Sequence, residues 1–108
     1  CKCVKGSIRG GTRVFYEGKV VVLGDANPGS EIVAWGNVVV MGALRGMVHA
    51  GADGNRDAVV AALKLCPTQL RIADLITRCP DSSDEPGMQP ELAFIKDEII
   101  YVEPLGIR

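Results

Sequence analysis

The sequence predicts an all-β protein, a parallel β-helix of triangular section with about 18 residues per coil. Three observations predict it. Glycines recur every six positions, the exceptions to that pattern recur every eighteen, and apolar and polar residues alternate without losing phase at the turns. An antiparallel sandwich whose glycines mark ordinary turns is the alternative interpretation.

The glycine repeat defines the corners of the predicted coil. Counting every six positions from Gly6 to Gly54 finds glycine at six of nine positions. The three exceptions, Thr12, Ser30 and Val48, are themselves eighteen apart. Glycine is required where φ is positive or where backbones approach closely. The nested periods therefore predict three faces per coil, with glycine at two of the three corners.

The alternation of residue types predicts which side chains face inwards. Between Val20 and Ala50 no even position carries a charge, and every charged residue is at an odd position. Such alternation indicates strands with one buried side, and a solenoid keeps its phase where hairpin loops would reset it. Even positions are therefore predicted to fill the core. The stacked columns predicted there are Val4/Val22/Val40, Ile8/Ala26/Leu44 and Val14/Ile32/Ala50.

The pattern is less regular after Gly54. Residues 51–57 (GADGNRD) predict a loop, and residues 58–65 (AVVAALKL) suit a helix or a strand by composition. We interpret 58–65 and the strand-like residues 69–76 (QLRIADLI) as further, less regular coils. Residues 79–90 (CPDSSDEPGMQP) predict a flexible surface loop. Residues 91–105 predict two short strands around Lys96–Glu98 that cap the end of the solenoid.

The first face, made by residues 19–23 and 37–41, is predicted to be apolar on its outer side. The odd positions there are Val21, Leu23, Val39 and Met41. Contiguous exposed apolar patches mark interfaces, so we expect these residues to form a homodimer interface. Coverage of the patch by a later loop or by the C-terminal segment is the alternative.

The second face, which follows the next corner, carries an arginine-containing column of Arg9, Asn27 and Arg45, with Asp25 beside it. Arginine on an otherwise flat surface of small residues suits carboxylates of a partner protein, whereas a plain solvated wall is the alternative. The third face is predicted to stack ordinary surface charges and one outward tryptophan. Its columns are Arg13/Glu31/His49 and Glu17/Trp35/Asp53.

Composition argues against several classes of function. The 108 residues correspond to one domain, and a net charge of −1 with scattered basic residues argues against nucleic acid as a partner. No apolar run is long enough to span a membrane. With one histidine and no paired C-x-x-C spacing, we expect no metal site, and we interpret the four cysteines as free thiols. Phosphate-loop and nucleophile-elbow motifs are absent, so we expect no cofactor and no enzymatic activity.

Residues 9–54 resemble a known family. The segments GDANPGSEIVAWGNVVVMGALRG and HAGADG, followed by ALKLCPTQLRIAD, are similar to the C-terminal domain of the septum-site-determining MinC proteins. The resemblance covers most of the chain and weakens after about Ile76. It implies a right-handed β-helix that forms homodimers and binds the membrane-associated ATPase MinD.

The resemblance also implies a binding motif. In the family, an Arg-Ser-Gly-Gln motif in the first coil contributes to MinD binding. Here it falls on Arg9, Gly10, Gly11 and Thr12, with Gly10 in place of serine and Thr12 in place of glutamine. The motif lies on the second face. The predicted MinD-binding residues are therefore Arg9, Gly10, Gly11, Thr12, Asp25, Asn27 and Arg45.

The function implied by the resemblance is that of a cell-division regulator. A cytoplasmic inhibitor would be recruited by MinD to the inner face of the cell membrane, where it would help position the inhibition of FtsZ assembly. The family's N-terminal FtsZ-inhibitory domain would lie outside this single-domain chain. Two alternatives remain. A bactofilin-like structural polymer would form filaments, and a hexapeptide-type acyltransferase would be a trimer that binds an acyl donor, with His49 as its base.

Overall fold

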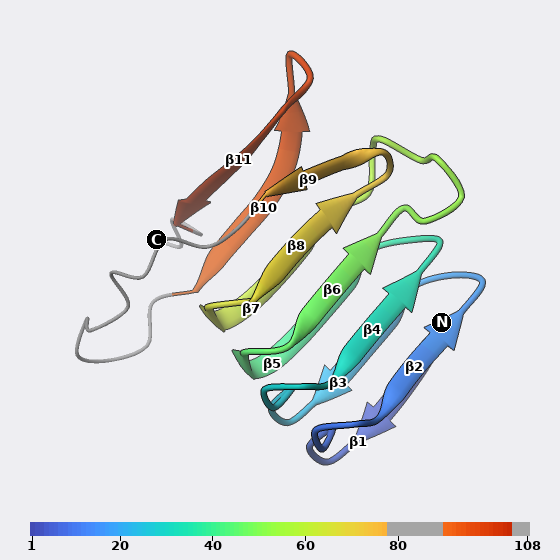
Figure 1. Cartoon of the computed structure of the whole chain (residues 1–108), viewed down its shortest axis with the longest axis vertical. Coiled ribbons are helices and arrows are strands. Elements are labelled where there is room, and N and C mark those ends of the chain that lie inside the picture. The colour runs from blue at the N-terminus through green and yellow to red at the C-terminus, as the bar shows by residue number, and fades with distance from the viewer. Residues whose placement is uncertain (78–89, 105–108) are drawn as a thin grey trace.

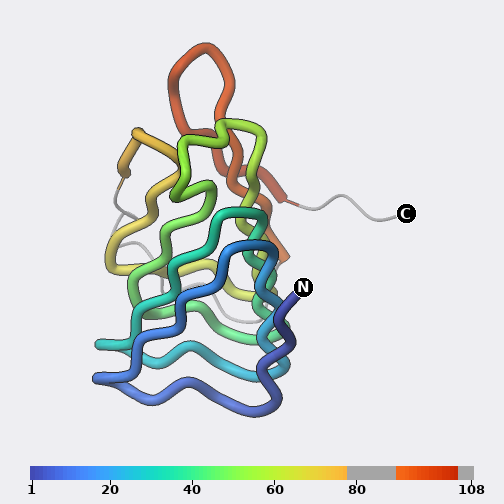
Figure 2. Tube along the Cα trace, turned by 90° about the vertical axis from the view of Figure 1, so that its right-hand side faces the viewer, coloured from blue at the N-terminus to red at the C-terminus, as the bar shows by residue number. Residues whose placement is uncertain are grey.

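A computed structural model describes residues 1–77 and 90–104. Within these ranges the chain is a right-handed parallel β-helix of about four turns, as predicted (Figures 1 and 2). No helix capable of crossing a membrane occurs in this part of the chain. The predicted loop over residues 79–90 lies, except for Pro90, outside the described residues. The strands are β1 (Lys2–Lys5), β2 (Arg13–Tyr16), β3 (Val20–Leu23), β4 (Glu31–Ala34), β5 (Val38–Leu44), β6 (Met47–Ala50), β7 (Val60–Leu65), β8 (Gln69–Ile72), β9 (Leu75–Thr77), β10 (Glu91–Lys96) and β11 (Ile99–Pro104).

The three predicted faces are present, and they differ in regularity. The first face is a six-stranded sheet in the order β1-β3-β5-β7-β10-β11, and the third is a five-stranded sheet in the order β2-β4-β6-β8-β9. The second face has no extended ladder of its own, although the ends of β5 and β7 continue onto it, where Ala43 pairs with Lys64 and Leu44 with Leu65. Single parallel bridges join Ile8 to Ala26 and Ala26 to Leu44 there. The short second face closes the triangular section between the two sheets.

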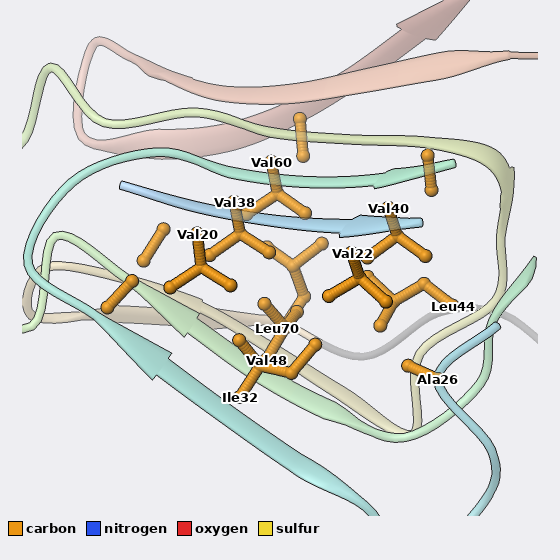
Figure 3. Packing of buried hydrophobic residues seen from close by; sticks show 14 of the residues in the cluster. Val20, Val22, Ala26, Ile32, Val38, Val40, Leu44, Val48, Val60 and Leu70 are labelled. Atoms are coloured by element: carbon orange, nitrogen blue, oxygen red, sulfur yellow. The ribbon is translucent and has the colours of Figure 1, made fainter. Parts of the chain in front are cut away.

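The core lies inside the coil, where side chains from all three faces meet (Figure 3). Val22 and Val40 come from the first face, Leu44 from the second, and Ile32 and Val48 from the third, and all are almost completely buried. All five are even-numbered, as the alternation predicts, although the odd-numbered Val33 and Ala43 are buried as well. Burying one such side chain stabilises the fold by about 1.5–3 kcal/mol.

Glycines stack where the first face turns into the second. A Cβ added to Gly24 would lie 2.6 Å from the carbonyl carbon of Gly6, and one on Gly42 would lie 2.6 Å from the carbonyl oxygen of Gly24. Of these three glycines only Gly6 has a positive φ, of 100°. Close approach between coils therefore explains the need for glycine at positions 24 and 42.

The eighteen-residue period holds across the first three strands of the first face but fails on the third face. Arg13 pairs with Glu31, eighteen positions on, whereas Glu31 pairs with Met47, only sixteen on. The third coil is two residues shorter at the corner between the second and third faces. Four predicted columns were therefore wrong in their third member, including Glu17/Trp35/Asp53, because Asp53 lies in a loop. For the other three the correct third member can be given. The observed columns are Val14/Ile32/Val48, Arg13/Glu31/Met47 and Thr12/Ser30/Gly46.

The fourth coil departs further from the repeat. Within residues 58–65 the structure has strand from residue 60 and no helix. This strand, β7, pairs in parallel with β5, but a register shift lies between Val40 and Ala43. Residues 69–76 do not form one strand of a coil, so that prediction was wrong in part. The chain reverses after β8, and β9 pairs with β8 antiparallel. Ala73, with a φ of 55°, begins the two-residue turn.

The C-terminal hairpin caps the first face, as the sequence predicted. β10 pairs antiparallel with β7 on one side and with β11 on the other. Asp97 and Glu98 form the two-residue turn, and both have positive φ, as type I′ hairpin turns require. Antiparallel hairpins therefore end both sheets at this end of the solenoid (Figure 1).

Candidate functional site

The second face brings the two arginines of the predicted column into line. Ile8, Ala26 and Leu44 point into the core and are joined by bridges, so the residues that follow them point outwards one above another. These are Arg9, Asn27 and Arg45. Both arginines are exposed, and neither forms an ion pair within residues 1–77 and 90–104. The face therefore offers two unengaged guanidinium groups to a partner.

Two stacked turns form the corner beside this column. Residues 9–12 and 27–30 each close with a backbone hydrogen bond, from Thr12 N to Arg9 O at 3.1 Å and from Ser30 N to Asn27 O at 3.0 Å. Gly11 and Gly29 occupy the third positions with φ of 85° and 87°, as type II turns require. The predicted residues Arg9, Gly10, Gly11, Thr12 and Asn27 are thereby brought together at one corner.

Gly10 is a glycine because the neighbouring turn leaves no room for a side chain. A Cβ at this position would lie 2.6 Å from the carbonyl oxygen of Pro28. Gly11 N also donates a hydrogen bond of 3.0 Å to Gly29 O, which fixes the two turns together. A serine at position 10, as in the family motif, would require the Pro28 backbone to move. At this corner the chain therefore presents backbone at positions 10 and 11.

The corner between the second and third faces is two residues shorter in the third coil than in the first two. Gly46 follows Arg45 directly and packs beneath Ser30, and Met47 N donates a 2.9 Å hydrogen bond to Ser30 O. Met47, at an odd position two residues after Arg45, would continue the second face if the eighteen-residue repeat held, but it begins a strand of the third face instead. The paired turns of the first two coils therefore form a ledge that the third coil lacks.

Asp25 has a structural role that the sequence did not reveal. Its Oδ1 accepts a 2.8 Å hydrogen bond from Ala43 N, and its own N–H donates a 3.1 Å hydrogen bond to Ser7 Oγ. The residue thereby links the first three coils at the edge of the second face. The eighteen-residue spacing of Ser7, Asp25 and Ala43 was the feature of the sequence that could have indicated this link between coils. A role for Asp25 in binding MinD stays a prediction.

The first face places the four predicted apolar residues side by side. Val21 pairs with Val39 in the ladder, and Leu23 and Met41 follow on the same side. Leu23 is 46% exposed and Met41 51%, so no described segment covers them as the alternative required. The sequence analysis missed an extension of this face. Leu92 pairs beside Ala61, and the rings of Phe94 and Tyr101 stack with centroids 6.1 Å apart.

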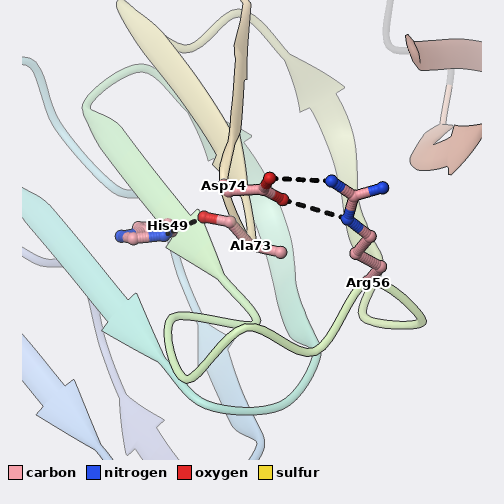
Figure 4. Close-up of polar contacts among 4 residues, drawn as sticks. All are labelled: His49, Arg56, Ala73 and Asp74. Carbon is pink, nitrogen blue, oxygen red and sulfur yellow. Dashed lines mark hydrogen bonds and ion pairs between the residues drawn. The ribbon is translucent and has the colours of Figure 1, made fainter. Parts of the chain in front are cut away.

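The third face shows ordinary surface contacts (Figure 4). Arg13 Nε lies 3.5 Å from Glu31 Oε2, in the first two coils of the predicted column. His49 lies beside Val33 rather than Glu31, and its Nε2 is 2.9 Å from Ala73 O. This contact gives His49 a structural partner and does not place a nucleophile beside it.

A bidentate ion pair ties the loop after β6 to the β8–β9 turn. Arg56 Nε and a terminal guanidinium nitrogen (Nη2) lie 3.0 and 2.7 Å from the two carboxylate oxygens of Asp74 (Figure 4). Hydrogen bonding to Arg56 lowers the pKa of the Asp74 carboxyl, and the same contact raises the pKa of Arg56.

Asp53, predicted to stack under Trp35, lies instead in the loop after β6. Within the described ranges no cluster of His, Cys, Asp and Glu is arranged to hold a metal ion.

Comparisons with known proteins agree on one family. The family model "Septum formation inhibitor MinC, C-terminal domain" matches residues 2–105. A curated relative from Acetivibrio thermocellus, named "Probable septum site-determining protein MinC", is 58% identical over 100 residues, which cover 92% of this chain and 44% of that protein. A relative of the same name from Persephonella marina is 49% identical over 104 residues, covering 96% and 52%. The chain thus spans about half the length of the curated relatives it matches.

A solved structure is also similar. The chain superposes on one from the MinC:MinD cell division protein complex of Aquifex aeolicus with a TM-score of 0.91 and 36% sequence identity. The match covers 99% of this chain and 87% of that one.

Proposed function

Because the chain belongs to the family of MinC C-terminal domains, we propose that it is a non-enzymatic domain of a division-septum inhibitor, which binds the ATPase MinD and a second copy of itself. The observation that carries the proposal is the match to a chain of a MinC:MinD complex over almost its whole length. The family assignment disfavours the acyltransferase and bactofilin-like alternatives.

The second face is the proposed MinD-binding surface. Arg9 and Arg45 are exposed and have no intramolecular carboxylate partner among the described residues, so they can bind carboxylates of a partner in a bidentate manner. A Cβ at Gly11 would stand in open space, so the missing side chain there allows a partner to approach the backbone of Gly10 and Gly11 closely. Thr12, Asn27 and Asp25 complete the proposed surface.

The first face is the proposed dimer interface. Val21, Leu23, Val39 and Met41 form an apolar surface on regular parallel strands, and Leu23 and Met41 are about half exposed in the single chain. A two-fold axis through this face would bury both patches at once, as isologous interfaces do. Dimerisation here would leave the second face of each copy free for MinD.

The proposed mechanism is spatial rather than chemical. MinD would hold the protein at the inner face of the membrane, and the location of MinD would decide where FtsZ assembly is inhibited. Membrane association would be indirect, through MinD. In the full-length protein, a further domain outside this chain would act on FtsZ directly, and this domain would supply dimerisation and positioning.

The proposal is tested by measuring binding of the chain to purified MinD with ATP and with ADP. We expect binding with ATP that Arg9→Ala/Arg45→Ala weakens strongly. The matched control is Arg13→Ala, which removes an exposed arginine of the third face and should leave binding unchanged. Equal binding by all three proteins would reject the second face as the MinD site. No binding by the unaltered chain would reject the proposed function itself.

A further inference from the structure

The free edges of the two sheets are not protected equally. Unpaired edge strands attract other strands, and proteins protect them by keeping them short or by placing lysine on them. β1 has four residues with Lys2 and Lys5 at its ends, β2 has four residues and begins with Arg13, and β9 has three. β11 has six residues and carries no lysine or arginine. Its glutamate and its proline, which can also protect an edge, occupy only the last two positions, and among the described strands it pairs only with β10.

β11 is also apolar on both of its sides. Its pairing with β10 defines these sides, since Val102 lies opposite the fully buried Ala93 and Tyr101 lies opposite Phe94. Val102 faces the core side and is nevertheless 47% exposed, whereas Ile99 and Tyr101 on the outer side are 55% and 43% exposed. A strand at the end of a sheet needs cover on one side only. On the core side of β11 Ile100 packs against the core, whereas Val102, the outer side chains of Ile99 and Tyr101, and the strand edge have little or no cover.

We propose that β11 pairs edge to edge and antiparallel with β11 of a second copy of this chain. A two-fold axis perpendicular to the sheet leaves the outer surfaces of both copies on the same face of the extended sheet. It also places one central residue opposite the same residue of the second copy. With Tyr101 at the centre, Ile99 pairs with Glu103 of the other copy, and Ile100 pairs with Val102. The exposed Val102 is then covered by an apolar neighbour on the core side.

Charge favours this register. On the outer side Lys96 lies opposite Ile99 within the hairpin. Pairing about Tyr101 places Glu103 of the second copy on the other flank of Ile99, two strand spacings from Lys96, or about 10 Å between backbones. The long side chains of Lys96 and Glu103 can extend past Ile99 towards each other across that separation. Because of the two-fold symmetry, this approach of Lys96 and Glu103 occurs twice in the pair.

The neighbouring registers are less favourable. Centring on Ile100 would place Asp97 opposite Glu103 of the other copy, which opposes two like charges. Centring on Val102 would place Pro104 opposite Ile100, where proline has no N–H to donate. The Tyr101 register alone avoids both problems.

This interface uses the strand edge, so it is separate from the proposed dimer interface on the first face. It does not depend on MinD binding. One molecule with two different two-fold interfaces forms either a closed tetramer or an open chain of copies.

The register is tested by disulfide trapping in the full 108-residue chain. Cα atoms directly opposite in antiparallel strands are about 4.5–5.5 Å apart, which permits a disulfide. We expect Tyr101→Cys to form a 101–101 bridge between copies under mild oxidation, located by peptide mapping because Cys1, Cys3 and Cys66 are also free thiols. Glu103→Cys is the matched control, because position 103 would face position 99. At least about tenfold more 101–101 than 103–103 bridge is expected, and equal amounts would overturn the proposal.

A charge-reversal experiment tests the same pairing without added cysteine. Glu103→Lys should shift association, followed by light scattering over a concentration series, to higher concentration because it opposes Lys96 of the other copy. Lys96→Glu/Glu103→Lys should restore association. Both positions are exposed, so folding is expected to survive, and circular dichroism checks this. Failure of the double variant to restore association, or no effect of Glu103→Lys, would contradict edge pairing.

Discussion

On the first face the outward positions of the second and third coils carry Val21, Leu23, Val39 and Met41, whereas on the second face, one corner further along the same coils, they carry Asn27 and Arg45. The inward positions of both faces fill one continuous core. The first face is a regular hydrogen-bonded sheet, but the second is held by single bridges, stacked turns and the Asp25 side chain. The difference shows that one repeating interior can support two outer surfaces with different chemistry.

Removing a core side chain should affect both faces together and have the largest effect. Ile32→Ala should lower the free energy of unfolding by about 2–5 kcal/mol, because Ile32 is fully buried and its loss leaves a cavity. Chemical denaturation measures this. Lys19→Ala, at an exposed position, should change stability by less than about 0.5 kcal/mol. Similar losses in the two variants would contradict a shared, closely packed core.

Disturbing the corner between the faces should have the next largest effect. Gly24→Ala should cost about 1–3 kcal/mol, because the new Cβ would meet the backbone of Gly6 and force the coils apart. Lys5→Ala, beside the same corner, should be nearly neutral. Thermal unfolding followed by circular dichroism compares the two. A neutral Gly24→Ala would show that close approach between coils does not limit this corner.

A substitution on the second face should change binding and leave stability unchanged. Arg45→Ala should weaken MinD binding about tenfold or more, because one charge-assisted hydrogen-bond donor is worth roughly 1.5–3 kcal/mol. Its denaturation midpoint should match that of the unaltered chain, since Arg45 is exposed and makes no ion pair among the described residues. Calorimetry with MinD and ATP measures the affinity. A lower midpoint accompanied by unchanged affinity would assign Arg45 a structural role.

The smallest effect is expected at the exposed Arg56–Asp74 pair, away from both faces. Asp74→Asn should slightly lower stability at neutral pH. Because folding lowers the pKa of Asp74, its contribution is present above the carboxyl's unfolded-state pKa and is lost as the pH falls through the folded-state value. The difference between the two proteins should therefore shrink on acidification. A difference that grows towards acid pH would contradict the assigned ion pair.

The sequence was sufficient to predict the interior, because alternation and glycine spacing are local consequences of stacking. Val20, Val22, Val38 and Val40 lie inside as their positions require. It was insufficient where a corner changes length. The turn at residues 27–30 has no counterpart after Arg45, and the eighteen-residue spacing does not reveal this difference. The predicted third-face columns are therefore wrong by two residues from the third coil onwards.

The alignment of the column in the candidate site was predictable from the sequence, but the local geometry around it was not. Arg9, Asn27 and Arg45 align because the second face keeps the eighteen-residue spacing through Ile8, Ala26 and Leu44. The eighteen-residue spacing places Asp25 beside Ala43, but the hydrogen bond from Ala43 N to the Asp25 carboxylate also depends on side-chain geometry that spacing does not encode. The reversal at Ala73 and the unprotected edge of β11 also depend on contacts that no repeat predicts.

The most direct test of separate partner surfaces compares two double variants in the same two assays. Val39→Glu/Met41→Glu and Arg9→Ala/Arg45→Ala, each combined with Glu103→Lys to weaken edge pairing, are measured for mass by light scattering and for per-site affinity for MinD with ATP. We predict that the first variant is monomeric and retains MinD binding, and that the second is dimeric and loses MinD binding. Loss of both properties in either variant would contradict the division of the two surfaces between two partners.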